Sequence, residues 1–160
     1  MFNRIETLQK KLLVGRSVKM SLIDNQTLPL WRGFMPLKKQ ITSIISPSMY
    51  AMQVYTTKPD FQNFDPSTIF TKWAAAEVSN HLNIPDGLYP YVLKGGLYAV
   101  FTHKGTPEQF QKTFMHIFMH WLPSSAYKLD DREHFELLPE NYRTDDPEAI
   151  EEVWVPVILK

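Results

Sequence analysis

The 160-residue chain contains no cysteine. This absence excludes disulfide bonds, thiolate catalysis and zinc sites that use cysteine ligands. Long hydrophobic runs are also missing. Neither the N-terminal segment nor any later stretch has the apolar length of a signal peptide or a membrane span. We therefore expect a cytoplasmic protein that does not enter a membrane.

The chain also lacks an excess of charge of either sign. Lysine and arginine number 17, aspartate and glutamate also number 17, and the formal net charge is zero. Surfaces that bind nucleic acid usually carry a basic bias, and the sequence has neither that bias nor a helix-turn-helix pattern. We expect no direct contact with nucleic acid.

Signatures of catalysis and of metal binding are scarce. His116 and His120 have metal-ligand spacing on an expected helix, but no HExxH pattern or nearby carboxylate accompanies them. Gly95-Gly96 precedes a strand without a phosphate-binding pattern, and no nucleophile elbow or Ser–His–Asp series is present. The sequence predicts neither a metal site nor a cofactor.

Apolar and aromatic residues are well represented. Apolar residues make up 44% of the chain, and 10 Phe, 7 Tyr and 4 Trp are among them. A chain of this length suits one domain, residues 1–160, with a sizeable core. The aromatic content is enough to fill that core and still line a pocket.

The strongest local signal runs from Gly95 to Pro123. Residues 97–103 are β-branched and aromatic, which predicts a strand. Thr106, Pro107 and Gln109 then form a capping box with proline at the first helical position. Aromatic and aliphatic residues follow at helical spacing, so we expect a helix that packs one face on the sheet.

The same order of elements is expected earlier in the chain. We predict a strand at 12–22, a helix that starts near 24–27, and strands at 49–55 and 70–78. Residues 46–48 are interpreted as a break, and Phe61 and Phe64 predict a loop that folds back over the body. A loop at 124–131 follows the second helix, and strands at 133–138 and 150–159 come after it, with a polar loop at 139–147 between the two strands. Pro156 indicates an edge or a bulge in the last strand.

This order predicts an α+β fold built of two pseudo-symmetric halves, at about 10–80 and 88–160. Each half is strand–helix–strand–strand, and an extended lead-in at 88–93 precedes the second. We expect the halves to join into one antiparallel sheet with the helices on one face. A central ligand groove is expected on the other face or at the seam between the halves.

Four segments in order resemble the GyrI-like small-molecule-binding domain, which is also the effector-binding part of some AraC-type and MerR-type transcription activators. They are GGLYAVFTHKGTPEQF, a helix ending in HWLPSS, then HFELLPENY, and EEVWVPV. The resemblance covers nearly the whole chain. It implies a pseudo-twofold domain whose groove accepts amphipathic, often cationic, aromatic compounds. It also implies that Glu136, the glutamate of the "FE" strand, lies in the pocket and pairs with the charge of the ligand.

The residues around Glu136 leave two interpretations open. In a pleated strand Glu136 faces opposite to Phe135 and Leu137. Glu136 then faces water if those two face the core, or it faces a groove. A carboxylate half-buried among aromatic rings either takes up a proton or attracts a cation. With the resemblance included, the groove interpretation is favoured.

Other groove residues are less strongly indicated. Trp73 is the first aromatic candidate, and the others are Tyr98, Trp31, Tyr50 and Trp121. Trp31 and Trp121 lie on apolar helix faces, where a core position is the common outcome. Met52 and Met115 suit an adaptable pocket, although methionine at such spacing usually fills a core. Glu77, on the same strand face as Trp73, is a second candidate acid that could equally be a solvated strand end.

Two functions fit these residues. The first is a binding protein that senses or sequesters a cationic amphipathic aromatic molecule, with Glu136 as counter-ion. The second is a hydrolase of small molecules, in which the pocket glutamate acts as general base with the help of Tyr98 or Tyr50. The exposed sheet edge allows a homodimer, and a separate regulator protein is a further partner to consider.

Overall fold

The computed structural model describes all residues 1–160. The sheet has nine strands, and their bounds are β1 Phe2–Leu8, β2 Lys11–Met20, β3 Ile44–Val54, β4 Phe70–Val78, β5 Tyr89–Leu93, β6 Gly96–Lys104, β7 Tyr127–Leu129, β8 His134–Leu138 and β9 Ile150–Leu159. The helical segments are α1 Thr27–Lys38, η1 Phe61–Asn63, η2 Pro107–Gln109, α2 Phe110–Met115, η3 His116–Trp121 and α3 Leu122–Ser124.

The sheet is antiparallel and has the same strand order on both sides of a central seam. The order is β1-β6-β9-β8-β3-β4-β2-β5, and β7 pairs with β9. From the β3–β8 seam outward, the first half continues through β4 and β2, and the second through β9 and β6. Each half therefore contributes a strand, a helix and two more strands in that order. The predicted α+β class with one antiparallel sheet is confirmed.

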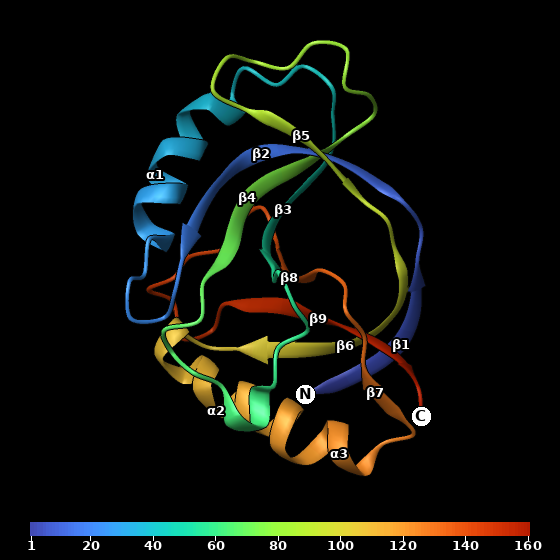
Figure 1. Ribbon diagram of the computed structural model, residues 1–160. Helices are drawn as coiled ribbons and strands as arrows, with labels where there is room; N and C mark the ends of the chain where they lie inside the picture. Colours follow the sequence, from blue (N-terminus) through green and yellow to red (C-terminus); the bar gives the residue numbers. More distant parts are fainter.

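The two ends of the sheet meet and close it into a ring. Strands β1 and β2 are separated by two residues, and so are β5 and β6. Leu8 of β1 pairs with Gly96 of β6, and Lys11 of β2 pairs with Leu93 of β5. The β1–β2 ribbon and the β5–β6 ribbon therefore stay paired as they pass from one half to the other. Figure 1 shows this ring, with β2 and β5 at the top and β6 and β9 at the bottom. Its interior is filled by a buried cluster that includes Met52, Tyr98 and Phe135.

The helices lie on the outside of the ring. Leu30 and Phe34 of α1 pack on β2, β3 and β4 through buried apolar residues of the first half. Ile117 and Phe118 of η3 pack on β6 and β9 in the second half. The α1 helix lies at the left in Figure 1, and the second helical region lies at the bottom. Two separate helices on one sheet face leave the β3–β8 seam between them.

The second helical region begins as its sequence predicts. The backbone N–H of Thr106 donates to Oε1 of Gln109 at 2.8 Å, which completes the predicted capping box. Helical structure continues through α2 and η3, the latter a π-helical stretch, and ends at Ser124. No helix of this chain combines the length and the apolar character needed to cross a lipid bilayer.

Several local expectations need correction. Strand β3 starts at Ile44, and the residues interpreted as a break (46–48) lie inside it, where the pairing with β4 is irregular. The predicted loop at 124–131 contains β7, and β1 is an additional strand that precedes the first predicted one. Pro156 was expected at an edge or a bulge, and it pairs with Tyr98 of β6 on one side of β9. On the other side, the pairing of β9 with β8 ends at Trp154. The missing N–H of Pro156 therefore costs β8 no hydrogen bond.

Candidate ligand-binding cavity

A cavity of about 1260 Å³ lies over the β3–β8 seam, between α1 and α2. Its floor comes from the sheet, including Gln53 of β3, Lys72 of β4 and Glu136 of β8. Trp31 and Met35 of α1 form one wall, and η2, α2 and η3 form the other. Cavities that bind drug-sized molecules have about 300–1,000 Å³ and a mostly apolar lining with a few polar groups. This cavity is somewhat larger, and 20 of its 35 lining residues are hydrophobic.

Aromatic rings dominate the lining. They come from both helical regions, from the sheet and from two connecting segments, and they are Trp31, Tyr55, Phe61, Phe64, Phe70, Phe110, Phe114, Phe118, Tyr142 and Trp154. The segment between β3 and β4 supplies three of them, Tyr55, Phe61 and Phe64. Its Phe61 ring packs 4.3 Å from that of Phe118 and meets Tyr55 edge to face. Such rings offer π-faces to a cation, each worth about 0.5–2 kcal/mol.

Glu136 is the carboxylate at the centre of the floor. Its side chain is 17% exposed, and Oε1 accepts a hydrogen bond from Nε2 of Gln53 at 3.4 Å. The nearest cation is Nζ of Lys72, 4.0 Å from Oε1, on a side chain that is 11% exposed. This separation is long for a direct ion pair, whose N–O distance is usually about 2.7–2.9 Å. Glu136 therefore keeps acceptor capacity for a ligand.

A second carboxylate, Glu151 of β9, also lines the cavity. It is 6% exposed. Burial raises its pKa to about 7, and the negative charge of Glu136 adds to this rise, while the Tyr142 hydroxyl and the Lys72 ammonium oppose it. Above pH 7 the two carboxylates and Lys72 carry a net charge of about −1. Below pH 7 that net charge is close to zero.

His134 is a buried imidazole in the same cavity wall. It is 6% exposed and packs edge to face against Tyr55 and Phe61, with ring centroids 5.5 and 5.4 Å away. Burial, with the charge of Arg132, lowers its pKa to about 3. The ring is therefore neutral at physiological pH.

This burial predicts a dependence of stability on pH. The unfolded chain binds a proton at His134 below about pH 6.5, whereas the folded protein resists it down to about pH 3. This titration therefore leaves the stability unchanged above pH 6.5, and it lowers the stability by up to about 1.4 kcal/mol per pH unit as the pH falls from 6.5 to 3. In urea unfolding at several pH values, His134→Phe is expected to lose stability less steeply with acid than wild type does. Equal slopes would contradict a neutral buried His134.

The structure brings some of the predicted site residues to this cavity. Glu136 is on the floor, on the same strand face as His134 and Leu138, and Trp31 is in the α1 wall. The Trp31 ring also meets Phe34 edge to face at 5.7 Å, so it joins the cavity to the core. Met115 lies at the rim and is more than one-third exposed.

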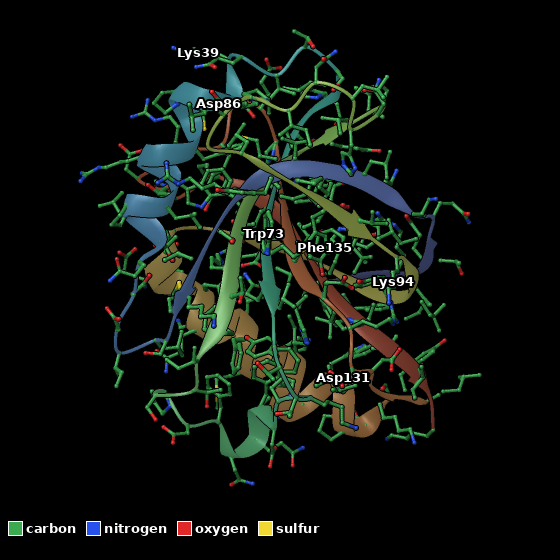
Figure 2. The ribbon with its side chains drawn as sticks, turned by 45° about the horizontal axis from the view of Figure 1, so that its top comes forward. Lys39, Trp73, Asp86, Lys94, Asp131 and Phe135 are labelled. Carbon is green, nitrogen blue, oxygen red and sulfur yellow. The ribbon has the colours of Figure 1, made fainter.

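The other predicted residues lie away from this cavity. Tyr50, Met52, Trp73 and Tyr98 belong to the cluster inside the ring, or pack against it. Figure 2 shows Trp73 near the middle of the molecule, as it does Phe135 from that cluster. The Tyr98 side chain is wholly buried, and its hydroxyl donates a hydrogen bond to the backbone carbonyl oxygen of Glu133 at 2.9 Å.

The two remaining candidates have structural partners. Glu77 pairs with Nζ of Lys11 at 3.4 Å, and its charge helps to raise the pKa of Tyr50 above the usual value, after burial. Trp121 stacks on Phe2 with ring centroids 5.0 Å apart and meets Phe101 edge to face. Neither side chain lines the cavity between the helices.

Sequence reasoning missed several residues of the lining. Lys72, His134, Tyr142 and Glu151 were not singled out. Period-2 alternation places His134 on the face of Glu136, so this residue was within reach of a sequence argument. Lys72 and Glu151 depend on the pairing register between distant strands, which the sequence alone does not reveal.

Comparison with known proteins agrees with the fold. A transcriptional regulator from Pseudomonas aeruginosa, BrlR, is 26% identical over 129 residues, which are 80% of this chain and 45% of BrlR. The chain thus spans about half the length of that regulator.

Two solved structures share the fold. SAV2435 bound to tetraphenylphosphonium superposes with a TM-score of 0.73 at 16% identity, covering 99% of this chain and 94% of that one. The C-terminal domain of EcmrR gives a TM-score of 0.72 at 12% identity, covering 98% and 97%. Residues 1–158 match the sequence family described as the GyrI-like small molecule binding domain. The two-halved sheet, its closure and this match over nearly every residue together place the chain in the GyrI-like family.

Proposed function

We propose that this protein binds cationic, amphipathic aromatic molecules in the cavity between α1 and α2. Glu136 acts as the counter-ion, and Trp31 forms part of the aromatic wall. The observation that carries the proposal is a mostly buried carboxylate on the floor of an aromatic cavity, 4.0 Å from its nearest cation. An incompletely paired carboxylate in such surroundings attracts a positive charge.

The comparisons support this assignment of ligand class. SAV2435, which has the same fold, was solved with tetraphenylphosphonium, an aromatic cation. BrlR is a regulator of transcription, and the matched region is less than half of it. In this proposal the chain corresponds to the ligand-binding part of such proteins, and it senses or sequesters its ligand alone or with a separate regulator.

A pair of ligands tests the role of charge. Methyltriphenylphosphonium and the neutral triphenylphosphine oxide each carry three phenyl rings on phosphorus, and they differ by one charge. Isothermal titration calorimetry at pH 7.5 is expected to give micromolar affinity for the cation, because one charge pair and a few cation–π contacts supply about 7–8 kcal/mol. The neutral compound is expected to bind at least about ten-fold more weakly. Equal affinities would show that shape and apolar surface alone govern binding.

The affinity for a cation should also rise with pH. Tetraphenylphosphonium does not titrate, whereas Glu151 loses its proton near pH 7 and adds a negative charge to the cavity. At an effective dielectric constant of about 20, a further charge several ångströms away is worth roughly 1–3 kcal/mol before screening by salt. We expect about three- to ten-fold tighter binding at pH 8 than at pH 6.

The control for this pH dependence is Glu151→Gln. It removes the proton acceptor and keeps the other titratable and charged groups that line the cavity, namely Glu136, Tyr55, Tyr142, Lys72, His103, His134, Arg143 and Asp145. The variant is expected to bind with nearly the same affinity at both pH values. A rise that persists unchanged in the variant would assign the effect to another group.

One observation favours a second function, the hydrolysis of a small electrophile. A carboxylate with a pKa near 7 is well matched to general-base catalysis at neutral pH, and Glu151 lies beside the Tyr142 hydroxyl. Tyr50 and Tyr98, the predicted helpers, lie on the other side of the sheet, so Tyr142 takes that place in this proposal. The two functions separate in one assay, because a hydrolase turns over a bound activated ester or epoxide and loses this turnover in Glu151→Gln. A binding protein holds such a compound unchanged.

A further inference from the structure

His134 contains an unusual polar atom. Nε2 of His134 is the one buried side-chain nitrogen or oxygen in this structure that has no hydrogen-bond partner. Buried polar atoms nearly always have a partner, so an exception calls for an explanation. A group that is partnered only when a ligand is present is one such explanation.

The position of His134 fits this explanation. It lines the cavity and stands two residues before Glu136 on the same strand, so both side chains leave the same face of β8. Two residues of a strand span roughly 7 Å. The rings of Tyr55, Phe61 and Phe118 pack against the imidazole and cover Nε2, which has no hydrogen-bond partner, so a ligand group reaches this atom when one of these rings moves aside.

The chemistry of His134 restricts the group it could bind. The imidazole is neutral because burial opposes its charged form. A neutral imidazole nitrogen either donates or accepts one hydrogen bond, depending on the tautomer. A hydroxyl group can both donate and accept, so it satisfies Nε2 in either case.

We propose that His134 is a second recognition point in the cavity and selects aromatic cations that carry a hydroxyl group roughly 7 Å from the positive centre. This inference rests on the proposed function, since Glu136 is taken to hold the positive centre. Glu136 supplies charge, the aromatic rings supply apolar surface, and His134 discriminates between ligands that are otherwise alike.

A matched pair of cations tests this discrimination. (4-Hydroxymethylphenyl)triphenylphosphonium and (4-ethylphenyl)triphenylphosphonium have nearly the same shape and the same charge, and only the first has a hydroxyl. Titration calorimetry is expected to show about five-fold tighter binding of the hydroxymethyl compound to the wild-type protein, the typical effect of one hydrogen bond.

Two variants attribute this preference to Nε2. His134→Phe keeps an aromatic ring and removes the nitrogen, and it is expected to bind both compounds with the same affinity. His134→Gln carries a polar group at nearly the same place, and it is expected to keep most of the preference. The ratio of the two affinities within each variant is the readout, so a general loss of stability does not imitate the effect.

The outcomes separate the two proposals. If wild type binds both phosphonium compounds equally well, the role of His134 is overturned while the cation site stands. The same holds if His134→Phe retains the full preference. If neither compound binds to wild type, the proposed function itself fails. It also fails if Glu136→Gln binds each compound with the same affinity as wild type does.

Discussion

Replacing Glu136 with glutamine is expected to weaken the binding of tetraphenylphosphonium at least about ten-fold at pH 7.5. The substitution keeps the size of the side chain and its hydrogen bond with Gln53, and it removes only the charge. Two opposite charges about 5 Å apart interact by roughly 3 kcal/mol at an effective dielectric constant of about 20. Partial screening at the cavity mouth reduces this value, and about 1.4 kcal/mol still corresponds to ten-fold in affinity.

The matched control is Glu77→Gln. Glu77 is also a partly buried carboxylate on a strand, but it pairs with Lys11 and is not among the residues that line the cavity. We expect this variant to bind the cation as wild type does. A large loss in Glu77→Gln with no loss in Glu136→Gln would move the site to the interior of the ring.

Removing the cation of Lys72 should have the opposite effect. Lys72→Met is expected to raise the affinity for tetraphenylphosphonium about ten-fold, because a fixed ammonium 4.0 Å from Glu136 repels an incoming cation and partly neutralises its counter-ion. Few substitutions in a binding cavity improve affinity, so this result would be distinctive. The measurement is the same titration, at pH 8, where Glu151 is mostly ionised.

The control for Lys72 is arginine. Lys72→Arg keeps the positive charge while it changes the shape of the side chain, so the affinity is expected to stay within about three-fold of wild type. Weaker cation binding by Lys72→Met would mean that Lys72 supports the cavity structurally or that the ligand presents an anionic group to it. Thermal unfolding of the three proteins identifies a structural contribution.

The sequence predicts the elements of this fold better than their arrangement. The capping box at Thr106 and the alternating strand at 70–78 are local signals, and both appear where they are expected. The N-terminal strand β1 has no comparable signal in its own residues. It forms because it pairs with β6, about ninety positions further along the chain. Contacts of this kind depend on tertiary structure, which overrides weak local preference.

The candidate site shows the same limit more sharply. Alternation along β4 correctly separates Trp73 from Lys72, but it does not say which of the two shares a face with Glu136. The pairing register decides this, because Ala51 of β3 lies opposite both Glu136 of β8 and Ala74 of β4, so these three side chains share one face. Lys72 is two residues from Ala74 and lies on that same cavity face, whereas Trp73 lies on the opposite face, inside the ring. A shift of one residue would exchange them.

The closure of the sheet explains the positions of the remaining predicted aromatic residues. Alternation along a strand does not by itself decide which side of the sheet Tyr50 and Tyr98 face. Pairing of the β1–β2 ribbon with the β5–β6 ribbon encloses one side, and that side becomes a second core. The large cavity lies on the helix-bearing side. Because closure depends on pairing between residues far apart in the sequence, no single segment indicates it.

The location of a bound cation tests the central claim most directly. We would crystallise the protein with tetraphenylarsonium, because the anomalous scattering of arsenic locates the positive centre without a full interpretation of the ligand density. The account predicts one strong peak between α1 and α2, within about 6 Å of the Glu136 carboxylate and against the aromatic wall. A peak inside the ring near Glu77 or Glu133, or one on the outer surface with the cavity empty, would contradict it.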